Sequence, residues 1–397
     1  MSTGLRIRVL PSLAEIAAAA WDACANPGAP SNSSVSPYNP FISHDFLCSL
    51  EISGSAVARA GWQPQHLVAE DESGQALGVM PCYLKSHSRG EYVFDRGWAE
   101  AYERAGGDYY PKLQVSVPFT PATGRRLLAT PGPHSHEVEA ALAQGLVELT
   151  RLRQASSAHV TFMPEREWHF LAERGFLQRN DQQFHWENAG YSTFDDFLGA
   201  LAARKRKVLK RERRDALANG IAVDWLTGSD LTEAVWDHFF AFYIDTGSRK
   251  WGRPYLTREF FSLVGARMAD RIVLIMAKRA GRYVAGAINF IGSDTLFGRH
   301  WGAMEHHPFL HFELCYYQAI AFAIARKLPR VEAGAQGEHK LARGYVPTTT
   351  YSAHYIADPA LRRAIAEYLE RERAYVDAAG REMSDMTPFR KDMAADA

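Results

Sequence analysis

The amino-acid sequence predicts an α/β (α+β) protein that contains a tandem duplication of two domains, each a mixed sheet flanked by helices. Two segments, residues 66–84 and 272–291, each place apolar strand patterns on both sides of a polar turn that contains glycine. Each segment is followed by further strand patterns, a long helical pattern and another strand. Because the same order of elements occurs twice, the sequence indicates an internal repeat.

Length and composition agree with two globular domains. The chain has 397 residues, which is more than one hydrophobic core usually serves. A hydrophobic content of 47% excludes wholesale disorder, and a formal net charge of zero gives no overall field that would favour DNA or a membrane. The longest apolar run, residues 314–325, is too short to span a bilayer, so no membrane span is expected.

Cysteine usage and the first residues of the chain predict a cytoplasmic protein. The four cysteines show neither CxxC nor metal-ligand spacing, so they are interpreted as free thiols in a reducing compartment. The N-terminal segment lacks the charged start, the uninterrupted apolar stretch and the cleavage site of a secretion signal. Its alanine run, with Leu13, Ile16 and Trp21, is typical of an amphipathic helix.

Four regions follow from these patterns. They are an N-terminal helix and linker (1–35), a first domain (36–190), a second domain with the expected active site (191–380) and a frayed tail (381–397). The elements predicted in the first domain are the hairpin 66–84, a strand at 112–119, a helix at 136–154 and a strand at 157–163. Those in the second are the hairpin 272–291, a strand at 295–304, a helix at 309–328 and a strand at 329–335.

A basic segment at the start of the second domain is the strongest local charge signal. Between Arg204 and Asp215 it holds eight Lys or Arg residues, and apolar residues at helical spacing predict a helix docked by one face. A solvated face is one interpretation, and an anion site for a phosphate-bearing partner is the other. No aromatic residues are interleaved for base stacking, which favours phosphate contact over base recognition. The predicted phosphate-binding residues are Arg204, Lys205, Lys207, Lys210 and Arg211.

Two further clusters contain residue types that could bind a metal ion or a substrate. Histidines gather at residues 300–311, but without an HExxH pattern and with two of them in a probable turn before Pro308, so no metal site is expected. Aromatic residues crowd the loops of residues 98–126, which suits a substrate site, although aromatic packing beneath long loops is the alternative. The substrate-binding candidates in these loops are Tyr109, Tyr110, Lys112 and Thr120.

The stretch EAGAQGEHKLARGY, residues 332–345, joins glycines and charges directly after a long apolar helix pattern. Glycine weakens regular structure, and charge is costly to bury, so such a segment fits a solvated cleft that holds an anion. This stretch belongs to a series of sequence motifs that occur in order between about residues 36 and 375. The series also includes NPFISHDFLCSLEISGS, VPFTPATGRRLL and FYIDTGSRKWGRPYLT. The series resembles the FemAB-like family of N-acyltransferases, whose members are often described as peptidoglycan biosynthesis or GNAT proteins (Gcn5-related N-acetyltransferases).

The resemblance implies two GNAT-like (acyl-CoA N-acyltransferase) domains and an active site in the second. It places Lys340, Gly344 and Tyr345 near the acyl and acceptor groups. The catalytic candidates are Lys340, His339, Glu338, Glu332 and His300. The further substrate-binding candidates are Trp301, Gln336, Arg343, Gly344 and Tyr345. Direct attack of an amine on an activated carbonyl needs no covalent nucleophile, which agrees with the lack of a GxSxG elbow.

The donor implied by the resemblance is acyl-CoA or aminoacyl-tRNA, with charged tRNA as a partner, a small-molecule or peptide-like amine as acceptor, and no metal. The R/Q-x-x-G-x-G/A loop that binds the pyrophosphate of acetyl-CoA is approached only by RYVAGA and RAGG, which miss its spacing. The long coiled-coil insertion of the Fem ligases is also missing from the pattern. A binding protein that keeps the double fold without catalysis is the alternative function.

Overall fold

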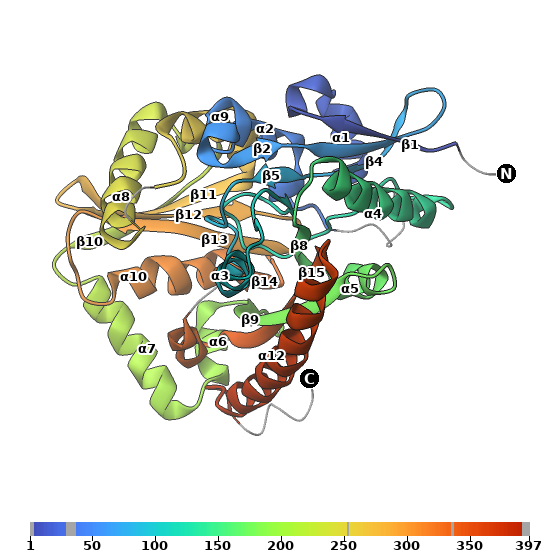
Figure 1. Cartoon of the computed structure of the whole chain (residues 1–397). Coiled ribbons are helices and arrows are strands. Elements are labelled where there is room, and N and C mark those ends of the chain that lie inside the picture. The colour runs from blue at the N-terminus through green and yellow to red at the C-terminus, as the bar shows by residue number, and fades with distance from the viewer. Residues whose placement is uncertain (1–3, 29–36, 252–253, 335–336, 391–397) are drawn as a thin grey trace. The chain divides into compact units, whose positions relative to one another are not determined.

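The computed structural model describes residues 4–28, 37–251, 254–334 and 337–390. The chain forms two compact units (Figure 1). The first contains Met1–Asp181 and Thr349–Asp377, and the second contains Gln182–Thr348 and Ala378–Ala397. The division differs from the predicted ranges 36–190 and 191–380 because the chain returns to the first unit at Thr349, where β15 (Val346–Ile356) pairs with β8 (Ser157–Met163).

The first unit begins with an antiparallel sheet of four strands. They are β1 (Arg6–Leu10), β3 (His66–Glu70), β4 (Ala76–Met80) and β7 (Leu128–Ala129). The predicted hairpin 66–84 is confirmed by the pairing of β3 with β4. The N-terminal prediction was partly wrong: α1 (Ala18–Ala25) is helical, but residues 6–10 form a strand because they find a partner in β3 that local periodicity does not reveal.

The second sheet of this unit contains a parallel pair joined by a helix. Strand β6 (Lys112–Val115) runs parallel to β8, and α4 (Ser135–Leu152) makes the connection, as parallel neighbours require. The neighbouring strands are β2 (Trp62–Pro64), β5 (Tyr83–Lys85) and β15. The apolar residues Leu113, Val115, Ala158 and Val160 share a core with residues of α4. The other helices are α2 (His44–Ile52), α3 (Arg96–Arg104), α5 (Glu165–Ala172) and the start of α12 (Pro359–Asp385).

The second unit repeats the parallel pair within a longer sheet. Its strands, in spatial order, are β10 (Ile221–Leu226), β11 (Ile272–Arg279), β12 (Arg282–Ile291), β13 (Thr295–Ala303), β14 (Arg330–Glu332) and β9 (Leu177–Glu187). The predicted hairpin 272–291 is confirmed as β11 and β12. Strands β13 and β14 are parallel, and the helical segment between them begins with α10 (Leu310–Phe312) and ends with α11 (Gln318–Ala325).

Helices cover both faces of this sheet (Figure 1). On one face α8 (Glu233–Trp251) contacts β12 and β13, and α9 (Arg258–Met268) packs on α8. On the other, α6 (Phe194–Ala200), α7 (Ala203–Ala216) and the helix that includes α11 share a core with the strands. The predicted helix 309–328 contains a π-helical turn, Glu313–Tyr317, which hydrophobic periodicity did not indicate.

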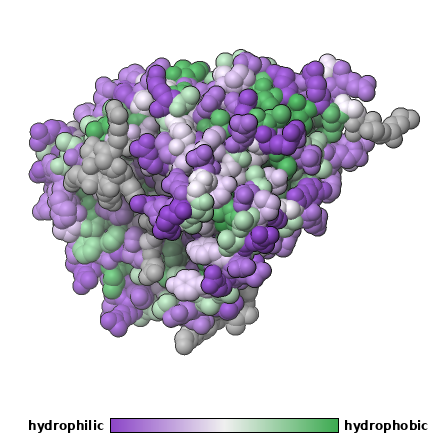
Figure 2. All heavy atoms as spheres, in the orientation of Figure 1, coloured by the Kyte–Doolittle hydropathy of each residue, from purple (hydrophilic) through white to green (hydrophobic). Residues whose placement is uncertain are grey.

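The end of the chain differs from the predicted frayed tail. Helix α12 continues to Asp385, and beyond it Leu201 and Phe389 form an antiparallel β-bridge. Phe389 is aromatic and packs against the second core, so its burial favours an ordered position despite the weak local pattern. In the described part of the chain, no helix combines the length and the apolar character needed to cross a bilayer. On the face drawn in Figure 2, hydrophilic side chains cover most of the surface.

Candidate functional site

The segment predicted to hold the active site forms a short 3₁₀ helix, η7 (Glu338–Arg343), directly after β14. Glycine brackets this helix: Gly337 has φ 119° and Gly344 has φ 88°, which are left-handed values that side chains disfavour. At Gly344 a Cβ atom would also lie 2.7 Å from the ring of Phe197. These two glycines therefore allow the chain to turn tightly around Lys340.

Lys340 is a buried amine with few partners. Its side chain is almost fully enclosed, with 1% exposure, and Nζ donates one hydrogen bond of 2.9 Å to the carbonyl of Gly334. Burial lowers its pKa to about 7, and Arg299 also acts in that direction while Cys315 opposes it. Among the described residues, no carboxylate forms an ion pair with Lys340. The amine therefore keeps unused hydrogen-bonding capacity.

Arg343 is held by a buried acidic residue of α7. Its guanidinium group lies 2.9 Å from Glu212 Oε2, donates to the carbonyl of His339 and stacks over the ring of Phe312. Glu212 also accepts a hydrogen bond from the hydroxyl of Tyr317. Glu212 interrupts the apolar stripe of α7, and this irregularity was the sequence signal that could have identified it. The role of Glu212 is to fix Arg343 and thereby η7.

The π-helical turn supplies aromatic neighbours of η7. A π turn widens the helix locally and is frequent at functional sites. Tyr316 hydrogen-bonds its hydroxyl to His339 Nε2 at 2.9 Å, and its ring lies 5.6 Å from that of Tyr345. Tyr345 is fully buried, and its hydroxyl finds no hydrogen-bond partner among the residues that the structure describes. Burial lowers the pKa of His339, and the positive charges of Arg343 and Lys340 lower it further.

The remaining candidates of this unit lie at different positions. Glu332 is buried at the end of β14, 4.0 Å from His185 Nε2. His300 contacts Tyr243 of α8, and burial lowers its pKa to about 3. Trp301, the next residue of β13, faces the opposite side of the sheet and contacts His311. Gln336 and the side chain of Glu338 lie outside the described residues.

The predicted basic helix is α7, and most of its positive charges are exposed, whereas Arg213 pairs with the buried Glu313. It is docked by buried Leu209 and Ala216, as its apolar stripe predicted. The side chain of Lys210 lies 3.9 Å from that of Asp195. Within the part of the chain that the structure describes, the other four predicted phosphate-binding residues have no ion-pair partner. They are Arg204, Lys207 and Arg211, which are exposed, and Lys205, which is half-buried.

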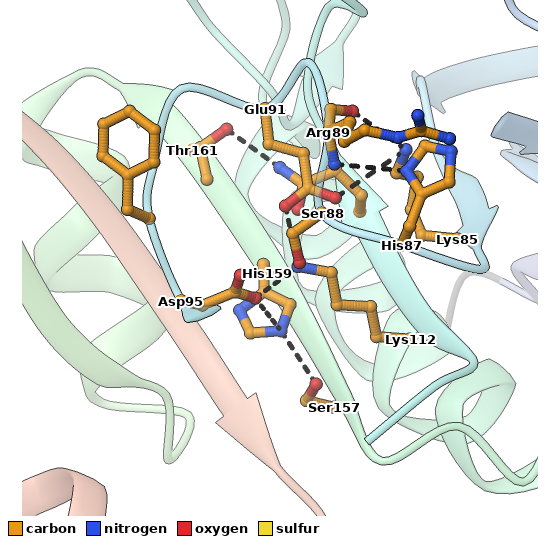
Figure 3. A network of polar contacts seen from close by, with 12 residues as sticks. Lys85, His87, Ser88, Arg89, Glu91, Asp95, Lys112, Ser157, His159 and Thr161 are labelled. Carbon is orange, nitrogen blue, oxygen red and sulfur yellow. Dashed lines mark hydrogen bonds and ion pairs between the residues drawn. The ribbon is translucent and has the colours of Figure 1, made fainter. Parts of the chain in front are cut away.

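The aromatic loops of the first unit enclose a separate polar cluster around Lys112 (Figure 3). Nζ of this lysine forms ion pairs with Glu91, at 2.7 Å, and with Asp95. Tyr109 donates its hydroxyl to the same Asp95 oxygen at 2.7 Å. Burial alone would lower the pKa of Lys112, but the two carboxylates outweigh it and raise the pKa above its usual value. Lys112 is thus a buried lysine whose two carboxylate neighbours favour its charged form.

The other two candidates of these loops have local partners. Tyr110 shares a 2.8 Å hydrogen bond with Ser88, and its ring lies 5.2 Å from that of Tyr109. Thr120 is buried and donates its hydroxyl to the carbonyl of Pro118. Sequence reasoning missed Glu91 and Asp95, since both lie in a loop that shows no periodicity.

The comparisons with known proteins agree with this architecture. A family model described as FemAB-like, peptidoglycan biosynthesis/recognition, matches residues 12–391. The chain belongs to the FemAB-like family. The crystal structure of FemX has a TM-score of 0.53 with 11% identity, over 91% of this chain and all of that one. The predicted class of mixed sheets flanked by helices is confirmed, and the similarity to FemX supports the fold.

Two further solved structures are similar over most of their length. A tandem GNAT protein from the clavulanic acid biosynthesis pathway has a TM-score of 0.44 at 14% identity, over 89% of this chain and 99% of that one. L-PGS from Bacillus licheniformis has a TM-score of 0.49 at 8% identity, over 85% of this chain and 99% of that one. A search of curated protein sequences finds no match to this chain.

Proposed function

We propose that this FemAB-like protein is an N-acyltransferase that moves an acyl or aminoacyl group from an activated donor to an amine acceptor in cell-envelope precursor metabolism. The description of its family, peptidoglycan biosynthesis/recognition, supports acyl transfer as the reaction class. The observation that carries the proposal is the buried amine of Lys340, whose pKa of about 7 and spare hydrogen-bonding capacity are unusual for a lysine.

The position of Lys340 in the sheet supports this role. Strands β13 and β14 pair only between Thr295–Phe297 and Arg330–Glu332. Beyond these pairs β13 continues to Ala303. The segment that follows β14 turns away through Gly334, which has φ 79°. The carbonyl that Lys340 contacts is that of Gly334, so the amine lies where the two strands separate. Backbone groups without strand partners at such a point are available to a ligand.

The chemistry assigns a role to each group around this point. The acceptor nitrogen attacks the donor carbonyl, a C–N bond forms, negative charge develops on the carbonyl oxygen, and the bond to the leaving group then breaks. Protonated Lys340 and the buried hydroxyl of Tyr345 are the donors that would stabilise the oxyanion. His339, kept neutral by its lowered pKa, would accept the proton of the attacking amine. Glu332 and Glu338 stay alternative bases.

The donor would bring phosphates to the basic face of α7. Acyl-CoA and aminoacyl-tRNA share this feature, so the exposed residues Arg204, Lys207 and Arg211 suit either. The two donors differ in size and in the length of the phosphate backbone. A comparison of acetyl-CoA with a charged tRNA in the same assay therefore separates them.

The test is a turnover assay with a muropeptide that carries a free amine. Purified protein is incubated with either acetyl-CoA or an aminoacylated tRNA, and mass spectrometry follows the mass increase of the muropeptide. Lys340→Ala should lower turnover about 10²-fold to 10³-fold, as loss of an oxyanion donor does elsewhere. The matched control is Lys327→Ala, which removes an exposed lysine of the same unit.

Two outcomes would contradict the proposal. Equal turnover by Lys340→Ala and the wild type would remove Lys340 from the reaction. If the wild type binds a donor, so that ligand raises its melting temperature, but forms no product with either donor, the non-catalytic binding protein becomes the better account.

A further inference from the structure

One face of the sheet β2-β5-β6-β8-β15 in the first unit carries a group of polar side chains on β5, β6, β8 and β15. Alternation and register place its residues in rows, because residues opposite each other on neighbouring strands share a face. One row runs across four strands: Tyr83, Gln114, His159 and His354. The adjacent row consists of Trp62, Lys85 and Lys112.

This polar face is buried rather than solvated. Lys85, Lys112 and Gln114 have 0% exposure, and residues 86–104 supply the carboxylates of Glu91 and Asp95 that meet the lysines (Figure 3). The residues that alternate with these, such as Leu113 and Val115, share an apolar core with α4. The sheet therefore has one apolar face and one face that lies in a buried polar layer. Burying polar groups opposes stability, so folding alone does not require such a layer.

Several atoms of this layer lack hydrogen-bond partners although they are buried. Folded proteins pair nearly all buried polar atoms with protein or ordered water, so a group of unpaired atoms on one face needs an explanation. Within the described part of the chain, the buried atoms of this layer that lack a hydrogen bond include Trp62 Nε1, Tyr83 Oη, Glu91 Oε1, Asp95 Oδ1, Gln114 Oε1 and His354 Nε2. Beside them, Lys85 makes a single long hydrogen bond of 3.4 Å, to the carbonyl of Arg89.

The charges of the layer are balanced without a ligand. Lys112 lies between Glu91 and Asp95, and Lys85 Nζ lies 3.8 Å from Glu91 Oε1. The layer therefore contains two lysines and two carboxylates in contact, and their formal charges balance. A charged ligand would thus leave an uncompensated charge in a buried layer, whereas a neutral one would not.

The unpaired atoms also specify hydrogen-bonding character. Trp62 Nε1 only donates, the oxygens of Glu91, Asp95 and Gln114 accept, and Tyr83 and His354 do either. Hydroxyl groups match such a mixture because each donates one hydrogen bond and accepts others. We propose that the polar layer binds a neutral, hydroxyl-rich ligand, a sugar or polyol, between the sheet face and residues 86–104. This would be a second ligand site, independent of acyl transfer at Lys340.

Entry would require the covering segment to move. Its edge, at Ser88 and Arg89, is reached by solvent, and both residues lie beside the cluster (Figure 3). A free sugar and a sugar that forms part of a larger molecule share the same chemistry. Single sugars and a chitin trisaccharide are therefore separate arms of the test.

The experiment measures binding by titration calorimetry. The neutral probes are glucose, N-acetylglucosamine, myo-inositol and chitotriose, and the charged counterparts are glucosamine and glucuronate. At least one neutral probe should bind, and its charged counterpart should bind about tenfold more weakly or worse. Binding of chitotriose alone would assign the layer to the sugar part of a larger molecule, and binding of a monosaccharide or myo-inositol would assign it to a free small ligand.

Conservative variants separate ligand binding from a structural role. Tyr83→Phe removes an unpaired hydroxyl and should weaken binding of the neutral probe about fivefold to tenfold, with an unchanged or higher melting temperature. Glu91→Gln is the second variant and should also weaken binding. Lys340→Ala should bind the probe as the wild type does, so the two proposals fail independently. No binding by any neutral probe, or wild-type affinity in Tyr83→Phe, would overturn the proposal and leave a layer filled with water.

Discussion

Both units bury lysine side chains, and Lys112 of the first unit differs from Lys340 of the second in its partners. Lys112 has 0% exposure and Lys340 has 1%, so their burial is equivalent. Lys112 meets two carboxylates, which raise its pKa, whereas Lys340 meets one carbonyl and its pKa falls to about 7. The comparison teaches that burial alone does not make a reactive amine. Two close carboxylates raise the pKa of Lys112. Lys85, with one carboxylate oxygen at 3.8 Å, and Lys340, with no ion pair among the described residues, both have a pKa lowered to about 7.

The helices that connect the parallel strands also differ between the two units. In the first unit α4 is a regular helix of 18 residues between β6 and β8. In the second, the helix between β13 and β14 contains a π turn of five residues. That turn brings Tyr316 to His339 and Tyr317 to Glu212. The duplicated fold thus carries a regular connection in one copy and an irregular one beside the candidate active site in the other.

The largest expected effect comes from removing the lysine that has two partners. Lys112→Met would leave Asp95 buried without its lysine and Glu91 with only Lys85 at 3.8 Å, so the free energy of unfolding should fall by about 3–5 kcal/mol. Lys340→Met leaves no carboxylate unpaired and should be neutral or stabilising. Urea unfolding of both variants measures the contrast. Equal losses of stability in the two would refute the distinction between the lysines.

A smaller loss is expected at the anchor of η7. Arg343→Met would leave Glu212 with only the hydroxyl of Tyr317, so the free energy of unfolding should fall by about 2–3 kcal/mol and turnover should fall as well. The control is Arg330→Met, which removes an arginine paired with the half-exposed Glu187 and should cost no more than about 1 kcal/mol. A cost at Arg343 as small as that at Arg330 would show that Glu212 does not hold η7.

The pH dependence of stability follows from the lowered pKa of Lys340. Above pH 7 the unfolded chain, in which the lysine pKa is near 10.5, binds more protons than the folded chain, so stability gains a contribution as pH rises. Relative to Lys340→Met, the free energy of unfolding of the wild type should rise by up to about 1.4 kcal/mol per pH unit between pH 7 and 10. Urea unfolding of both proteins at pH 6 to 10 measures it. A constant difference would contradict the lowered pKa.

The smallest effect is expected on the exposed face of α7. Lys207→Glu should raise the KM for a phosphate-bearing donor about tenfold with little change in kcat, and the effect should shrink as salt rises from 50 to 200 mM. Arg214→Glu is the matched control on the same helix, since Arg214 is paired with Asp215. If both substitutions change KM equally, general charge rather than a defined face of α7 attracts the donor.

Much of the fold could be predicted because local patterns carry it. The two hairpins and the helices that became α4 and α7 follow from strand alternation and helical spacing. Strand β1 and the bridge at Phe389 depend on partners distant in sequence, so periodicity could not reveal them. The return of the chain to the first unit at Thr349 is a long-range pairing of the same kind.

The segment proposed as the site is apparent in the sequence, but its neighbours in the fold are not. Glycines around η7 and the charges between them identified the segment that contains Lys340 and Arg343. The neighbours that set its chemistry, Tyr316 and Glu212, come from other elements. Among the sequence signals, only the acidic interruption of the α7 stripe indicated one of them.

The central claim, that Lys340 is an amine that titrates near neutrality while two carboxylates favour the charged form of Lys112, can be measured directly. NMR of the side-chain nitrogens of ¹⁵N-lysine-labelled protein reports each protonation state across a pH series, and Lys340→Met and Lys112→Met assign the two signals. The Lys340 signal should change near pH 7, and the Lys112 signal should stay that of an ammonium group beyond pH 10. A Lys340 signal that stays protonated beyond pH 10 would contradict the account.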